Sequence, residues 1–333
     1  MMSMAPASLL MLLVAGNASL AANNAVATQT PPDWAFPINP AINAPAAAVA
    51  AAAENADPRL LQVPGSSVRL TRAQTRDYFN VPDWHPEGHR EMPDIVAHGR
   101  APDVYACGYC HLPNGQGRPE NSGIAGLSAP YIIQQLQDFA NGKRHSSVPL
   151  HKPAAMMGAL AGKVSASDIR VAAQYFSQLK PKRWIRVVEA ATVPRTHVAG
   201  WMLVPIKSGA REPIGQRIVE MAENLHRTEL RDDASGFVSF VPPGSIARGK
   251  LLVTTGGEGK ASPCISCHGP HLEGTAIAPH LAGRSPSYLM RQLYDIQHGA
   301  RNGAAVASMK PNIANLTLSD MVAITAYIAS LDP

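Results

Sequence analysis

Two stretches decide the fold: ACGYCH at residues 106–111 and PCISCH at residues 263–268, each of which contains Cys-x-x-Cys-His. The two motifs use all four cysteines of the 333-residue chain: Cys107, Cys110, Cys264 and Cys267. Cys-x-x-Cys occurs in redox dithiols and zinc sites, but a histidine directly after it is typical of covalent haem attachment. The thiols then form thioethers with the haem, and the histidine gives the iron an axial nitrogen. We therefore predict two haem c groups, with His111 and His268 as iron ligands.

Two other interpretations of the cysteines stay open at this point. Four buried or disulfide-bonded cysteines would need no cofactor, and a zinc ribbon would bring both cysteine pairs to one ion. The pairs, however, lie far apart in the sequence, and a histidine directly follows each of them. The doubled motif favours haem over both alternatives.

The N-terminus predicts export. The first 22 residues carry no charge, and an apolar run over Leu9–Val14 is followed by the small residues Ser19 and Ala21. This pattern resembles a secretory signal peptide cleaved near Ala21 or Ala22, although the usual basic start is missing. The run is short for a membrane span. Because bacteria attach haem c outside the cytoplasm, we expect a periplasmic protein.

The charge of the chain argues against one class of partner. The formal net charge is +5, a mild excess for 333 residues. Haem propionates would reduce it further. Domains that bind nucleic acids concentrate far more positive charge on one face, so we expect no nucleic-acid partner.

An internal repeat relates two parts of the chain. His111 and His268 are 157 residues apart, and the same offset superimposes YIIQQLQDFANGKR (131–144) on YLMRQLYDIQHGAR (288–301). It also superimposes IAG at 124–126 on LAG at 281–283. Apolar residues in each longer segment fall on one face of a helix. Each of the two repeated parts, the first half and the second half, is thus predicted to contain a haem motif, a loop and an amphipathic helix.

A second helix closes each half and helps to identify the other axial ligand. Ser165 and Thr317 both precede an acidic residue by three positions, which predicts the start of a helix. Met157 and Met309 each lie eight residues before these positions. A methionine thioether is a known axial ligand that raises the reduction potential. We predict Met157 and Met309 as the second ligands, with Met156 packed as an ordinary apolar side chain.

Other histidines could ligate iron in principle, but they do not recur at matching positions. We therefore interpret them as solvated or structural. They are His145, His151, His271, His280 and His298.

With these features the sequence resembles two-haem cytochromes c of the cytochrome c4 type. The resemblance rests on the two Cys-x-x-Cys-His motifs, the LAG segment, the Tyr…Gln-Leu helices and the methionine loops. It covers about half the chain, residues 91–180 and 246–333. It implies a mainly α fold with two tandem class I cytochrome c domains, and haem ligation by His111 with Met157 and by His268 with Met309.

The remaining segments have no counterpart in that family. Residues 184–193, WIRVVEAATV, and 236–245, GFVSFVPPGS, predict a β-containing insert that is either structural or a docking surface. Ala44–Ala56 predicts a flexible linker. The expected division has five parts: the signal peptide (1–22), the N-terminal extension with linker (23–90), cytochrome domain 1 (91–180), the inter-domain insert (181–245) and cytochrome domain 2 (246–333).

The predicted function is electron transfer without substrate turnover, so we assign no catalytic residues. Two hexacoordinate haems leave no open iron site for a substrate. The expected partners are a donor dehydrogenase or respiratory complex and an acceptor oxidase or reductase. Two alternatives remain: a peroxidase-like two-haem enzyme, which needs an open axial position, and a cytochrome subunit of a membrane dehydrogenase, docked through the extra segments.

Overall fold

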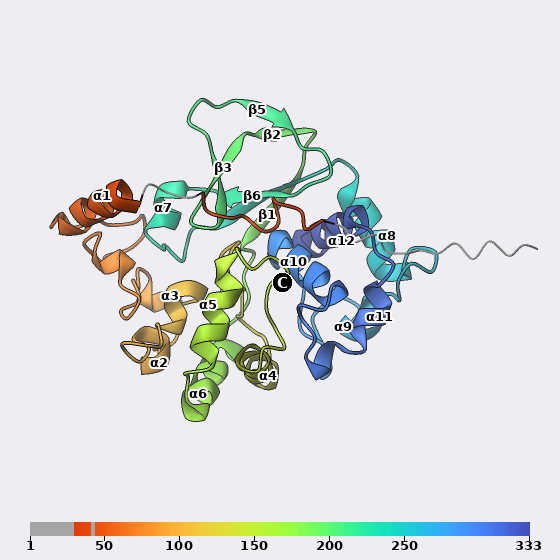
Figure 1. Ribbon diagram of the computed structural model, residues 1–333, viewed down its shortest axis with the longest axis horizontal. Coiled ribbons are helices and arrows are strands. Elements are labelled where there is room, and N and C mark those ends of the chain that lie inside the picture. The colour runs from red at the N-terminus through yellow and green to blue at the C-terminus, as the bar shows by residue number, and fades with distance from the viewer. Residues whose placement is uncertain (1–29, 41–43) are drawn as a thin grey trace, which may run out of the picture.

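The computed structural model of the protein describes residues 30–40 and 44–333. The predicted signal peptide, residues 1–22, lies outside the described residues. Within the described ranges, no helix is both long enough and apolar enough to cross a membrane. The fold is mainly helical with small sheets, and the strands gather above two groups of helices (Figure 1).

The first half consists of five short helices. They are α2 (Asp94–Ala97), α3 (Cys107–His111), α4 (Ala129–Ala140), α5 (Lys152–Ala161) and α6 (Ala166–Ser177). Ser165 caps α6 as predicted, because its side chain accepts a hydrogen bond from the backbone N–H of Asp168. Helix α4 packs against α5 and α6 and buries a core that contains Ile132 and Phe176.

The second half repeats this order with a longer first helix. Its helices are α8 (Ser245–Thr255), α9 (Ile265–His268), α10 (Pro286–Gln297), η3 (Ala304–Val306), α11 (Met309–Ile313) and α12 (Leu318–Ser330). Thr317 and Asp320 form the capping box that starts α12, as predicted. Helices α8 and α12 cross so closely that any side chain at Gly249 would collide with the carbonyl oxygen of Ala323.

The insert between the halves contains the strands, as its β-branched stretches predicted. They are β1 (Ile185–Glu189), β2 (Thr192–Pro194), β3 (Thr196–Ala199), β4 (Met202–Pro205), β5 (Arg211–Pro213), β6 (Val219–Ala222) and β7 (Phe237–Val241), with the short helix α7 (Leu225–Glu229) before β7. One sheet has the order β1-β7-β6, with β1 parallel and β6 antiparallel to β7. Two antiparallel pairs, β2 with β5 and β3 with β4, complete the insert.

The insert is packed onto the second half. Ile218 and Val241 are buried against Val322 and Ala326 of α12. Glu220 on β6 accepts hydrogen bonds from the Ser285 hydroxyl and the Ser287 backbone N–H at the start of α10. These contacts favour a structural role for this part of the insert.

The N-terminal extension contacts both halves. Residues 34–36 pack on the core of the second half, where the Phe36 ring meets Tyr294 edge to face. Further along, the extension forms η1 (Gln74–Arg76) and η2 (Pro86–Gly88) and contacts the first half. There the Tyr78 carbonyl oxygen accepts a hydrogen bond from the backbone N–H of Ala106, next to the haem motif.

The prediction of a flexible linker over Ala44–Ala56 is wrong. This segment forms the helix α1. Alanine has the highest helix propensity of all residues, and no proline or glycine lies inside the run after Pro45. Composition alone suggested a linker, whereas local propensity favours the helix.

Candidate haem-binding sites

The two histidines of the motifs have the same hydrogen bond. The Nδ1 atom of His111 lies 2.8 Å from the carbonyl oxygen of Ser122, and that of His268 lies 2.8 Å from the carbonyl oxygen of Pro279. Since only an N–H can donate to a carbonyl, Nδ1 carries the proton and Nε2 keeps its lone pair. Such a second bond orients metal-binding histidines.

The surroundings of both histidines favour the neutral ring that binds a metal. Burial lowers the pKa of His111, and the nearby Arg144 guanidinium adds to this effect. Burial likewise lowers the pKa of His268, with a further contribution from Arg301. Both rings are therefore neutral at pH 7.

The cysteines are placed as two separate pairs. Burial raises the pKa of Cys107 to about 12 and that of Cys264 to about 11. All four thiols are free of disulfide bonds. A zinc ribbon would need the thiols in one group, and the part of the chain that the structure describes contains no such group.

A large cavity adjoins the first motif. Cys107, Cys110 and His111 lie on its wall, and so does Met157. The space measures about 1390 Å³, including the part that opens to solvent. Much of the wall is apolar, with side chains that include Leu127, Ile132, Leu136, Phe139, Leu160 and Phe176.

These residues fit a haem c. The cavity offers two thiols, an imidazole with a free Nε2 and a thioether, within an apolar wall suited to a flat macrocycle. Met157 lines it and Met156 does not. Arg144 and Arg291 also reach the wall, where they can meet anionic propionates.

The second half arranges the equivalent residues around its own core. Cys264 and Met309 are partly buried and pack against the same apolar cluster, which contains Leu272 and Leu293. Met309 is the first residue of α11. His268 is buried, whereas Cys267 is exposed.

His151 is the site residue that the sequence did not single out. The side chain lines the first cavity, has 2% exposure, and neither ring nitrogen has a hydrogen-bond partner. Burial and the Arg291 guanidinium lower its pKa to about 3. His145 also reaches this cavity. The sequence did not distinguish His151 from the other histidines, because its neighbour Arg291 comes from the other half of the repeat.

Parts of the chain are similar in sequence to known proteins. Residues 246–332 match the cytochrome c family. The cytochrome c4 of Pseudomonas aeruginosa is 32% identical over 136 residues, which cover 38% of this chain and 67% of that protein. The chain belongs to the cytochrome c family. This cytochrome spans about two thirds of the length of its cytochrome c4 relatives.

Two further similarities extend over more of this cytochrome. A protein of Thiomonas intermedia named thiosulfate dehydrogenase electron acceptor is 25% identical over 232 residues, covering 69% of this chain and 80% of that protein. The solved cytochrome c4 of Acidithiobacillus ferrooxidans has a TM-score of 0.45 and 20% identity, covering 68% of this chain and 98% of that one.

Proposed function

We propose that this cytochrome is a periplasmic two-haem electron carrier. The observation that carries the proposal is the repeated histidine geometry: both motif histidines donate Nδ1–H to a carbonyl oxygen eleven residues further on and keep Nε2 free. A single fortuitous motif would not reproduce this bond at the same spacing. The haem, when bound, supplies one-electron Fe(II)/Fe(III) chemistry.

The protein's own residues account for the carrier role. His111 with Met157 would hold the first haem iron, and His268 with Met309 would hold the second. Apolar side chains such as Leu136 and Phe176 keep water away from the first site. A haem iron held by two protein ligands in a site with little water would be stable in both oxidation states and would have no open position for a substrate.

The proposed partners are redox proteins. The Thiomonas relative is named as the electron acceptor of a thiosulfate dehydrogenase. We propose a donor dehydrogenase of that kind and an acceptor oxidase or reductase. Association with a membrane complex through the extension and insert is compatible with this assignment.

The test combines composition with electron transfer. Intact mass after acid-acetone extraction should still include two haems, and the protein should be recovered from the periplasmic fraction. A thiosulfate dehydrogenase supplied with thiosulfate should reduce both haems, whereas thiosulfate alone should not. Turnover of peroxide or thiosulfate by the purified cytochrome itself would contradict the carrier role and favour an enzyme.

A further inference from the structure

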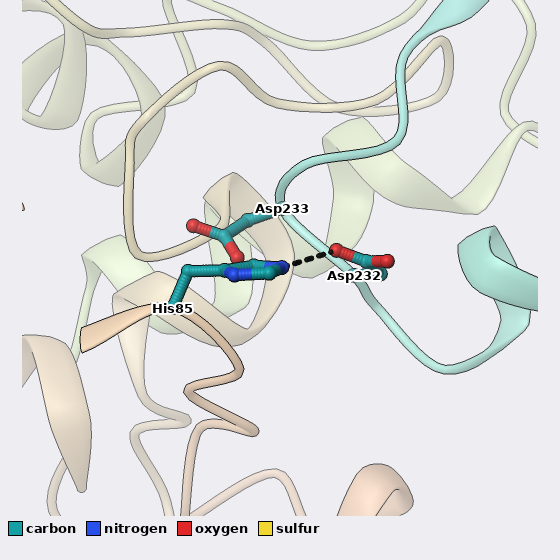
Figure 2. Close-up of side chains that lie close together, drawn as sticks. All are labelled: His85, Asp232 and Asp233. Carbon is teal, nitrogen blue, oxygen red and sulfur yellow. Dashed lines mark hydrogen bonds and ion pairs between the residues drawn. The ribbon is translucent and has the colours of Figure 1, made fainter. Parts of the chain in front are cut away.

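The N-terminal extension and the insert meet beside the first half, outside the cavity that adjoins the haem motif. The buried Trp84 joins them, because its Nε1 donates a hydrogen bond to the Leu230 carbonyl oxygen at 2.7 Å. Next to this contact, His85 faces Asp232 and Asp233 (Figure 2). One potential ligand atom from each of these three residues lies within 4.8 Å of the other two.

Asp232 is held firmly in place. Its Oδ1 lies 3.0 Å from His85 Nε2 and accepts the backbone N–H of Ala234 at 2.9 Å. Its Oδ2 accepts a hydrogen bond from Arg227 Nε at 2.6 Å. The carboxylate of Asp232 therefore has its orientation fixed by groups outside the cluster, as ligating carboxylates commonly do.

Asp233 lacks such partners. The residue is 5% exposed, and its Oδ1 is buried without any hydrogen-bond partner. Burial raises its pKa to about 6. A buried carboxylate oxygen without a partner is costly, so a cation bound beside Asp233 would stabilise the folded protein.

The donor set identifies the missing partner. One imidazole and two carboxylates suit a borderline divalent metal, whereas calcium and magnesium prefer oxygen alone. Ligands at about 2.0–2.2 Å around a tetrahedral ion lie about 3.4 Å apart. His85 Nε2 and Asp232 Oδ1, now hydrogen-bonded at 3.0 Å, would need to separate only slightly to bind one ion. We infer that His85, Asp232 and Asp233 bind one divalent transition-metal ion, for which zinc is the best chemical match.

The position of the proposed ion indicates a structural role. The loop that carries Asp232 and Asp233 also contacts the first haem motif, since Arg231 Nη1 donates to the Tyr109 carbonyl oxygen at 2.7 Å. The backbone carbonyl of Asp233 accepts a hydrogen bond from Asn114. A bound ion therefore ties the extension and the insert to the segment that carries Cys107 and Cys110. This inference does not depend on haem ligation or on the redox partner.

A neighbouring cluster provides a matched control. His89 Nε2 lies 3.0 Å from Asp83 Oδ1, and His89 Nδ1 lies 2.8 Å from the Arg90 carbonyl oxygen. Both ring nitrogens of His89 therefore have partners without an ion. Asp83→Asn thus removes a nearby carboxylate that the proposed site does not use.

The experiment uses the untagged full-length holoprotein, stripped with a chelator and then titrated with zinc. Elemental analysis should give one zinc per protein, with haem iron as an internal standard, and zinc should raise the unfolding temperature. Asp233→Asn and His85→Gln should weaken zinc binding at least tenfold, whereas Asp83→Asn should bind like the parent. Unchanged haem absorbance would show that each variant is folded.

X-ray absorption at the zinc edge of the parent tests the ligands without any variant. It should show nitrogen and oxygen neighbours at about 2.0–2.1 Å and no sulfur. Absence of stoichiometric zinc in the parent, sulfur in the first shell, or equal binding by Asp233→Asn would each overturn the inference.

Discussion

Arg144 and Arg301 face each other as an antiparallel β-bridge at the boundary between the halves. Arg144 Nη2 donates hydrogen bonds to the Tyr288 hydroxyl at 2.7 Å and to Gln292 Oε1 at 2.9 Å, both from the opposite half. Arg301 Nη2 makes the equivalent bonds, at 2.8 and 2.9 Å, to the first half's Tyr131 and Gln135. The repeated segments therefore contact each other reciprocally, because the arginine of each half bonds the tyrosine and glutamine of the other half.

This exchange predicts coupling between the two arginines. Arg144→Gln should destabilise the protein by about 2–4 kcal/mol, because buried polar partners lose their donor. Each glutamine oxygen also bonds the arginine of its own half, so it keeps one donor in either single variant. The double variant with Arg301→Gln should therefore cost about 1 kcal/mol more than the sum of the singles. Denaturant unfolding of the holoprotein measures the stability of the two single variants and of the double variant.

An exposed arginine serves as the control for this cycle. Arg183 pairs with Asp332 on the surface, and both side chains are largely exposed. Arg183→Gln should change stability by at most about 1 kcal/mol. Strict additivity of Arg144→Gln and Arg301→Gln would show that the two arginines act independently.

The adjacent methionines give the second prediction. Met157→Ala should open one axial position of the first haem, because Met157 lines the cavity. We expect loss of part of the near-infrared methionine–iron band, a lower potential and carbon monoxide binding at that haem only. Optical potentiometry and carbon monoxide titration of the ferrous protein provide the measurements.

Met156→Ala is the matched control. Met156 is partly buried and does not line the cavity, so its loss should cost less than the roughly 2–5 kcal/mol of a fully buried methionine and leave the haem spectrum unchanged. The reverse pattern would mean that the repeat alignment is off by one residue. If neither variant alters the first haem, His145 or His151 becomes the ligand to test.

The sequence predicted what depends on local spacing and repetition. Thr317 with Asp320 identified the start of α12, and strands β1 and β7 followed from β-branched runs. It could not predict contacts between distant segments, such as the burial of His151 beside Arg291. The composition of Ala44–Ala56 is typical of a linker, but the helix propensity of its alanines favours α1.

The insert gives the third prediction. Ile218 is fully buried against α12, so Ile218→Ala should destabilise the protein by about 2–5 kcal/mol. The exposed Ile277 offers a control, and Ile277→Ala should change stability by less than about 0.5 kcal/mol. Thermal unfolding should measure both stability changes, and the haem spectra of the two variants should match that of the parent. Equal stability of the two variants would remove the argument that the insert is structural.

The last prediction concerns acid stability and rests on His151. Its pKa is about 3 in the folded protein because of burial and the Arg291 guanidinium, against about 6.5 in an unfolded chain. Below pH 6.5 the unfolded state therefore binds a proton that the folded state does not, and stability falls as the pH drops. Between pH 7 and pH 5 this group alone should remove about 2 kcal/mol.

Replacing the imidazole should abolish that part of the pH dependence. His151→Phe keeps an aromatic ring beside Phe36, which His151 meets edge to face at 5.8 Å, and cannot take up a proton. The stability difference between variant and parent should therefore shift by about 2 kcal/mol in favour of the variant from pH 7 to pH 5. Parallel pH profiles for His151→Phe and the parent would mean that the folded protein accommodates the charged ring, which would place a negative group of the bound cofactor beside it.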